Sequence, residues 1–412
     1  MMIKEKYTIN NEETSLNLVQ TQIESVRKKN ITKTGFRLYK DKKIGVSGAI
    51  GQYDEKEQWE KAEKALSLNI DYPYEVSASL EKSVQKPCDF SDGIVFTEEM
   101  EELLQELRQR HPQFIFSNKL KLLTDDVILE NDNGLKLHSR ISKIEASVLI
   151  KDKSSSDLMD AFMGMEGTKW DREEFLRLTN MTCTGLEKDV DIENGIHKVV
   201  MIPFGCDFMG KMYSELHGLK YGTGGSLFSG KIGEKLFSDD FTLYQSLSPE
   251  DGILEPFFDA EGTVNKNFRY PLIEQGILKS PYTDKKYADQ FNLVLTGAAG
   301  GSYDSVPSLS PHPLVIKNSE KTMKELLDGE KAIIVLFASG GDFTPEGRYA
   351  TPVQTSFLFD GEKMLGRLPQ LNITSHIYDM FGKNFIGVAK DSFTSLFPMH
   401  LPVMNMKVEK II

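Results

Sequence analysis

Residues 126–151 read DVILENDNGLKLHSRISKIEASVLIK, and this stretch sets the fold class because two apolar runs flank a turn signal. The turn signal is the pair Asn133 and Gly134, which accepts the positive φ angles that a type I′ turn requires. We therefore expect an antiparallel hairpin with strands over residues 126–130 and 135–151.

A second hairpin is expected closer to the N-terminus. Its strands cover residues 35–39 and 44–48, and a polar turn at residues 41–43 joins them. Before this hairpin, the spacing of apolar residues over 16–26 predicts an opening amphipathic helix.

Further helices follow from capping and charge signals. Asp54 is suited to cap one helix, with Glu57 completing a capping box, and its apolar face comprises Trp59, Ala62 and Leu66. The next helix begins near Thr97 and stops at His111, with acidic residues in its first turns and arginines in its last, as the helix dipole favours. We expect its apolar stripe to pack in the core; the stripe is Met100, Leu103, Leu104 and Leu107. Two more helices are expected over residues 171–178 and 322–327, and a buried strand over 198–203.

The distribution of these elements predicts an α+β protein divided near residue 195. Residues 1–195 are expected to form an α+β domain of hairpins and helices. Residues 196–412, rich in short strands and glycine turns, are expected to form a mainly antiparallel β domain.

Composition excludes several classes of function. The formal charge of −12 argues against a nucleic-acid surface. No run approaches the roughly 20 apolar residues that a membrane-spanning helix needs. The three cysteines, Cys88, Cys183 and Cys206, are too far apart to make a disulfide framework, so we expect a cytoplasmic protein.

The stretch with most bearing on function is residues 209–233, MGKMYSELHGLKYGTGGSLFSGKIG. Together with FDAEG at 258–262 and LIEQGILK at 272–279, it resembles the TldD/PmbA family, the modulators of DNA gyrase. Catalytic members of that family carry His-Glu-x-x-x-His just before the F-S-G-K-x-G run, and this chain has Met209, Gly210 and Ser214 at the three defining positions. They also carry a late Gly-Thr-Cys-Gly-Lys run, whereas this chain has no cysteine after Cys206.

These substitutions matter because a catalytic zinc needs imidazole, thiolate or carboxylate ligands and a base for its bound water. A thioether, a hydrogen atom and a hydroxyl at positions 209, 210 and 214 supply none of these. The resemblance is therefore to the PmbA (TldE) branch, whose members pair with a zinc-bearing TldD partner.

The resemblance implies a non-catalytic subunit of a metallopeptidase complex that acts on short or unfolded peptides. It implies no cofactor in this chain and zinc in the TldD-type partner. It also implies a C-terminal β domain that curls around a cavity and helps to build the substrate chamber. A homodimer is possible when the partner is missing.

Alternatives remain open at this point. Cys206, Glu215 and His217 have side chains that bind zinc, and a metal site rebuilt from them would make the chain a self-sufficient metallopeptidase. Their spacing is unfavourable, because residues two apart on a helix point to different faces. A homodimeric peptide-binding protein without a peptidase partner is a third possibility.

Two further features of the sequence are expected to be structural. Asp259 and Glu261 could act as a paired acid and base, but solvated carboxylates in a turn are the favoured interpretation. The run 225–232 resembles a phosphate-binding loop, but Ile232 follows Lys231 where a serine or threonine is required.

Overall fold

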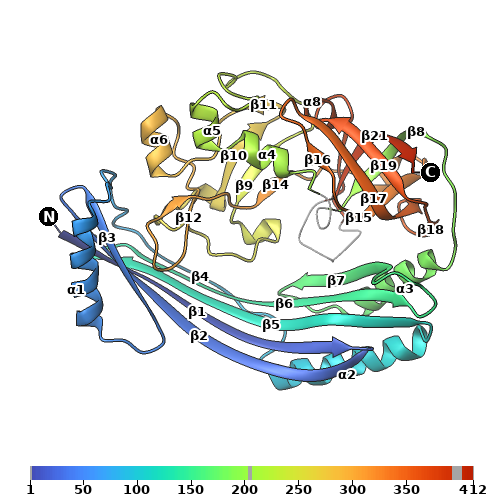
Figure 1. Ribbon diagram of the computed structural model, residues 1–412, viewed down its shortest axis with the longest axis horizontal. Helices are drawn as coiled ribbons and strands as arrows, with labels where there is room; N and C mark the ends of the chain where they lie inside the picture. The colour runs from blue at the N-terminus through green and yellow to red at the C-terminus, as the bar shows by residue number, and fades with distance from the viewer. Residues whose placement is uncertain (1, 203–206, 392–400, 412) are drawn as a thin grey trace.

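The computed structural model describes residues 2–202, 207–391 and 401–411 (Figure 1). A sheet of very long strands lies along one side of the molecule, and a β-rich C-terminal part lies over it. The protein is α+β with mostly antiparallel pairing, as the sequence predicts.

The first sheet has seven strands in the order β3-β2-β1-β5-β6-β4, with β7 also paired to β6. Its longest strand has 19 residues, which corresponds to about 60 Å at the usual rise per residue. Among the described pairings of this sheet, only β4–β6 is parallel. The strands are β1 (Met2–Val19), β2 (Gln22–Lys40), β3 (Lys43–Ile50), β4 (Glu81–Lys86), β5 (Phe114–Asn131), β6 (Lys136–Asp152) and β7 (Ala161–Gly167).

The predicted helix over residues 16–26 is wrong, because this segment is the tip of the β1–β2 hairpin. Leu16 and Leu18 both point into the core, which is the two-residue period of a strand. Gln20 and Thr21 make the turn with φ angles of 49° and 62°. Neither residue is a glycine, so the sequence carries no strong turn signal here.

Both predicted hairpins are confirmed. Asp41 and Lys42 join β2 to β3 with positive φ at both positions, as in a type I′ turn. The β5–β6 loop is different, since only Gly134 has positive φ and the expected type I′ geometry at Asn133 is wrong. The Asn131 side chain organises this loop by accepting hydrogen bonds from the backbone of Asn133 (3.0 Å) and Leu135 (3.2 Å).

The three other predicted helices of the N-terminal part are present. In α1 (Glu55–Ala65), Asp54 accepts the backbone N–H of Glu57, while the Glu57 carboxylate pairs with Lys61. α2 (Gly93–Arg110) begins about one turn earlier than expected because Asp92 caps it, and its predicted apolar stripe is buried. α3 (Arg172–Leu186) is capped by Asp171 and extends beyond the predicted end.

Five strands of the C-terminal part close into a ring, which confirms the expected curling of this region. β15 pairs with β8 on one side and with β17 on the other, so the order β15-β8-β21-β19-β17 returns to its start. The ring strands are β8 (Gly195–Met201), β15 (Ala332–Ala338), β17 (Arg348–Phe359), β19 (Leu371–His376) and β21 (Pro402–Lys410).

Among the shorter elements, some strands pair with the ring, and others form a separate four-stranded sheet and a separate two-stranded sheet. α7 (Met323–Leu327) is the predicted helix near residue 322, and Thr322 and Glu325 form its capping box. β8 is the predicted buried strand up to Met201. The other elements of this part are β9 (Leu243–Ser246), β10 (Arg269–Glu274), β11 (Ile277–Leu278), β12 (Ala299–Gly300), β13 (Ser308–Leu309), β14 (Leu314–Ile316), β16 (Asp342–Phe343), β18 (Met364–Arg367), β20 (Phe385–Val388), α4 (Gly210–Glu215), α5 (Gly218–Gly222), α6 (Lys285–Phe291) and α8 (Ile377–Met380).

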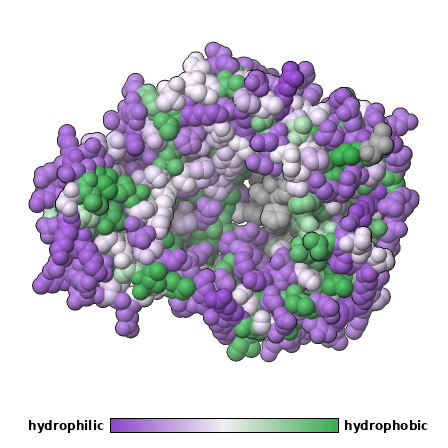
Figure 2. Space-filling view, viewed as in Figure 1, coloured by the Kyte–Doolittle hydropathy of each residue, from purple (hydrophilic) through white to green (hydrophobic). Residues whose placement is uncertain are grey.

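The two parts share buried surface. One hydrophobic cluster runs from α2 and α3 to ring residues such as Val200 and Ile334. A smaller cluster joins Leu129 and Leu137 of the sheet to Phe257 of the C-terminal part. Between these contacts the surface is hollowed, near the centre of the face shown in Figure 2. The domain boundary near residue 195 stays a prediction.

None of the helices within the described ranges is long and apolar enough to cross a membrane.

Candidate functional site

The residues at the three zinc-motif positions lie on the short helix α4. Met209 occupies its N-cap position and packs against a hydrophobic cluster of the C-terminal part that includes Phe208, Met212 and Val335. At Gly210, an added Cβ would lie 2.2 Å from a carboxylate oxygen of Asp207, so the Asp207 side chain would have to rotate away to admit a side chain here. The Ser214 hydroxyl accepts a hydrogen bond from Lys220 at 2.8 Å.

A buried ion cluster occupies the interior side of α4. One Glu215 carboxylate oxygen lies 2.8 Å from the Lys211 ammonium and 2.7 Å from the Lys220 ammonium. The other oxygen accepts the backbone N–H of Leu227 at 2.6 Å. Lys211 also donates to the carbonyl of Pro345 at 3.0 Å, so it is held from two sides.

This cluster carries a surplus positive charge. Burial by itself would raise the pKa of Glu215, but the two ammonium groups and the Leu227 N–H outweigh it, and the pKa is lowered. Two cations share one carboxylate, so a divalent cation brought here would meet like charges. A metal bound by Glu215 would compete with both lysines for the carboxylate.

His217 lies apart from this cluster. It occupies the N-cap position of α5, and its ring packs edge-on against Tyr282, with centroids 5.5 Å apart. Burial lowers the pKa of His217, which favours the neutral imidazole. The sequence hypothesis of a metal site also needs Cys206, which lies outside the described residues. Within those residues, no three His, Cys, Asp or Glu side chains form a group that could hold a metal.

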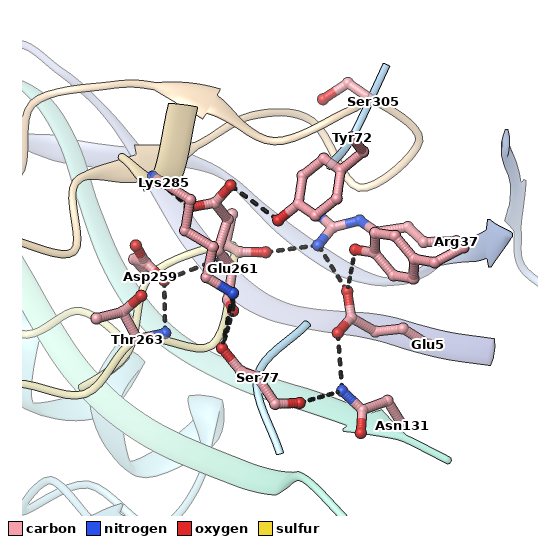
Figure 3. Close-up of polar contacts among 12 residues, drawn as sticks. Glu5, Arg37, Tyr72, Ser77, Asn131, Asp259, Glu261, Thr263, Lys285 and Ser305 are labelled. Atoms are coloured by element: carbon pink, nitrogen blue, oxygen red, sulfur yellow. Dashed lines mark hydrogen bonds and ion pairs between the residues drawn. The ribbon is translucent and has the colours of Figure 1, made fainter. Parts of the chain in front are cut away.

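Asp259 and Glu261 are buried, and their expected solvation is wrong (Figure 3). Asp259 accepts backbone N–H groups from Glu261 (3.0 Å), Thr263 (2.7 Å) and Ala299 (3.1 Å). Glu261 accepts the Tyr72 hydroxyl at 2.9 Å and the backbone N–H of Lys285 at 3.0 Å.

The burial of these two groups changes their protonation. Loss of solvation raises the pKa of Asp259 to about 6. Loss of solvation and the nearby charge of Asp259 raise the pKa of Glu261 to about 7. Because their oxygens are occupied by protein donors and hidden from solvent, a substrate cannot reach them. They hold the loop in place.

Residues of the first sheet bind the loop that carries Asp259 and Glu261. Arg37 is fully buried and donates to the carbonyl of Ala260 and to Glu5, the latter at 3.2 Å. The Tyr39 hydroxyl donates to the same Glu5 oxygen at 2.9 Å. Lys285 closes the contact by donating to Ser77 at 3.0 Å. We name this set the inter-part clamp: Glu5, Arg37, Tyr39, Tyr72, Ser77, Asp259, Glu261 and Lys285.

Sequence reasoning missed both Arg37 and the lysine pair on Glu215. An arginine inside the apolar run at residues 36–39 was the available signal for a buried charge. The i,i+4 spacing of Lys211 and Glu215 was the signal for their ion pair.

Charged side chains also line the first sheet where it faces the C-terminal part. Ile144 and Ala146 pack in the core with α2, so the alternating neighbours Lys143 and Glu145 point the opposite way. Leu137, on the same face of β6, packs against Phe257 of the C-terminal part. The charged groups form cross-strand pairs: Lys121–Glu145 at 2.9 Å, Lys143–Glu145 at 3.1 Å and Lys143–Glu166 at 2.8 Å.

Comparison with known proteins places this geometry in context. Residues 199–410 match the family model of the PmbA/TldA metallopeptidase C-terminal domain. An uncharacterised protein of Methanocaldococcus jannaschii is 26% identical over 156 residues, covering 38% of this chain and 36% of that protein. A metalloprotease of the same organism is 26% identical over 160 residues, covering 38% of this chain and 35% of that protein. The chain thus spans about a third of the length of these relatives.

Three crystal structures share the fold over almost the whole chain. A proposed modulator of a DNA gyrase from Thermotoga maritima superposes with a TM-score of 0.81 at 16% identity, covering 99% of this chain and 96% of that one. TldE from Thermococcus kodakarensis gives 0.78 at 19% identity, covering 98% and 96%. A proposed modulator of DNA gyrase from Bacteroides thetaiotaomicron gives 0.76 at 15%, covering 100% and 94%. At these identities the likeness concerns the fold.

Proposed function

The chain belongs to the TldD/PmbA family, and on that premise we propose that it is a non-catalytic, TldE-like subunit of a cytoplasmic metallopeptidase complex. Its role is to complete the chamber in which a zinc-bearing TldD-type partner degrades or matures short unfolded peptides.

The observation that carries the proposal is the composition of α4. The helix presents a thioether, a glycine and a serine where a catalytic site needs two imidazoles and a base. The Lys211–Glu215–Lys220 ion cluster fixes the interior side of the same helix, so the helix is held in place without a metal. The surplus positive charge of this cluster also opposes the entry of Zn²⁺.

The charged face of the first sheet supports a role in holding peptides. Lys121, Lys143, Glu145 and Glu166 present polar groups toward the C-terminal part, where Figure 2 shows a hollow. An extended peptide offers one N–H and one C=O per residue, and a polar wall can bind these groups with little dependence on sequence. A chamber of this kind accepts unfolded chains and excludes folded proteins by size.

The test combines metal content with activity. We expect elemental mass spectrometry of the purified, untagged chain to find zinc well below one equivalent, and the chain alone to leave an unfolded peptide intact. Adding a zinc-loaded TldD-type chain from the same source should produce cleavage above that of the TldD-type chain alone, and a zinc chelator should remove it.

The opposite result is equally specific. Near-stoichiometric zinc that is lost in Glu215→Gln or His217→Ala would show a self-sufficient metallopeptidase with a rebuilt site. Binding of peptides without any stimulation of the TldD-type chain would instead indicate a peptide-binding protein with no peptidase partner.

A further inference from the structure

Lys220 brings an ammonium group to Ser214, the last of the three motif positions. The Lys220 ammonium donates to the Ser214 hydroxyl oxygen at 2.8 Å and to a Glu215 carboxylate oxygen at 2.7 Å. The side chain of Lys220 is 33% exposed, and Ser214 is exposed as well. An accessible positive charge is therefore present at this position without a metal.

Both groups keep a proton that they can donate to a ligand. An ammonium has three N–H groups, and the Lys220 ammonium uses two of them on Ser214 and Glu215. The Ser214 oxygen accepts from Lys220, and within the described ranges its own proton has no protein acceptor. One N–H and one O–H group, on side chains that touch each other, are thus free to donate.

Buried neighbours fix the position of the Lys220 ammonium. The Glu215 side chain is 1% exposed, and its second oxygen accepts the backbone N–H of Leu227 at 2.6 Å. The first oxygen is shared with Lys211, which is 8% exposed and also donates to the carbonyl of Pro345. Because the partner of Lys220 is itself held from several sides, the two free donors are ordered before a ligand binds, which lowers the entropy cost of binding.

The carboxylates around this site leave Lys220 only partly neutralised. In the described part of the chain, Glu215 is the one carboxylate within ion-pair distance of Lys211 or Lys220, and its single charge is shared by both. Three more carboxylates belong to neighbouring segments: Asp207 lies beside Gly210, Glu346 is exposed next to Pro345, and Asp284 caps α6 by accepting the N–H of Tyr287 at 2.9 Å. The ring of His217 adds no charge, because burial lowers its pKa.

We propose that Lys220 and Ser214 bind a carboxylate group of a peptide, with the ammonium donating to one carboxylate oxygen and the Ser214 hydroxyl donating to the other. The peptide carboxylate supplies the part of the counter-charge that Glu215 does not. Either the C-terminus of the peptide or an acidic side chain can provide it. This inference rests on the proposed function and adds a substrate preference to it.

The experiment measures the affinity of three ten-residue peptides, each carrying a neutral label at the N-terminus, by fluorescence anisotropy. The first has a free C-terminus, the second an amidated C-terminus, and the third an amidated C-terminus with one internal glutamate; all other residues are uncharged. The full chain is used alone and with a zinc-free TldD-type partner. We expect a carboxylate-bearing peptide to bind about three- to tenfold more tightly than the neutral peptide, the range of a partly exposed, charge-assisted contact.

Three variants assign the effect. Lys220→Gln leaves Lys211 and Glu215 as a balanced ion pair, so it should fold, lose the preference for carboxylate and keep its affinity for the neutral peptide. Lys220→Arg keeps the charge and should keep the preference. Ser214→Ala removes an exposed hydroxyl and should reduce the preference without abolishing it.

The matched control is Lys279→Gln. It removes a lysine of the same part that is 41% exposed and paired with one carboxylate, Glu274, at 3.1 Å. This variant should show the same preference as wild type, because Lys279 has a counter-charge of its own.

The outcomes separate the two proposals. Equal binding of the neutral and carboxylate-bearing peptides, or a preference that survives Lys220→Gln, overturns the role of Lys220 and leaves the proposed function standing. Binding of none of the peptides, with or without the partner, overturns the proposed function and this inference together. A preference for the free C-terminus alone, or for the glutamate peptide alone, supports the inference and identifies the source of the carboxylate.

Discussion

The Tyr72 hydroxyl, from the segment between α1 and β4, donates a hydrogen bond of 2.9 Å to the Glu261 carboxylate of the C-terminal part. The two residues are 189 positions apart in the sequence, and both are buried. Their contact ties the glycine-containing loop at residues 258–262 to the first sheet. The stability of this junction depends on the protonation of Glu261, because water is excluded around it.

The first prediction concerns pH. Glu261 has a pKa of about 7 in the folded protein against 4.5 when unperturbed. The folded state then binds more protons than the unfolded state between these values, so stability should fall as pH rises through this window. Glu261→Gln removes the titration, and we expect the stability difference between wild type and variant to change by about 1 to 3 kcal/mol between pH 5 and pH 8. Urea denaturation at several pH values measures it.

The control for this experiment is Glu274→Gln, which removes a half-exposed carboxylate from the same part of the chain. Its stability relative to wild type should stay constant over the same range. A difference between wild type and Glu261→Gln that also stays constant would show that Glu261 does not change protonation between the folded and unfolded states.

The second prediction concerns the ion cluster on α4. Glu215→Gln leaves Lys211 and Lys220 close together without a carboxylate, and Lys211 is 8% exposed. Removing one partner of a buried ion pair costs about 3 kcal/mol or more, and we expect a loss of that order in the free energy of unfolding.

A double-mutant cycle checks the origin of this loss. Glu215→Gln combined with Lys211→Met should be clearly less destabilising than the sum of the two single changes, since the second change removes a charge that the first left unpaired. Additive losses would show that the two residues do not interact.

The third prediction is that restoring the motif does not restore a peptidase. Met209→His, Gly210→Glu and Ser214→His together should yield neither stoichiometric zinc nor cleavage, because the late cysteine is also missing. Zinc analysis and a peptidase assay of the triple variant check this. Peptide cleavage by the purified variant would show that the ligand assignment is incomplete.

The fourth prediction concerns the contact of residues 303–304 with the first sheet. An added Cβ at Gly35 would lie 1.7 Å from the carbonyl oxygen of Tyr303, so Gly35→Ala must displace this segment. We expect a loss of about 2 to 4 kcal/mol in stability and faster proteolysis between residues 300 and 307. Gly195→Ala, whose Cβ meets its nearest atom at 3.8 Å, should behave as wild type. Unchanged proteolysis in Gly35→Ala would contradict the close contact.

Local signals in the residues were sufficient for part of the fold. The hairpin at Gly134, the capping by Asp54 and the stripe around Leu103 were all predicted and are confirmed. Each depends on residues within a few positions of one another, where turn chemistry, capping and periodicity act. The helix prediction for residues 16–26 was wrong because this segment has no such local signal. Its turn at Gln20 and Thr21 contains no glycine, and the strands paired with it decide its conformation.

Some features of the candidate site could likewise be predicted from the sequence, and others could not. The residue types at positions 209, 210 and 214 were readable from the sequence, because the lack of a zinc ligand is a property of a side chain and needs no neighbour. The burial of Asp259 and Glu261, the insertion of Arg37 between Glu5 and Ala260, and the closure of the β15–β17 ring were not readable. Whether a carboxylate is solvated or buried depends on what packs against it, and here Arg37 and Tyr72, two of the residues that cover this loop, lie more than a hundred positions away in the sequence.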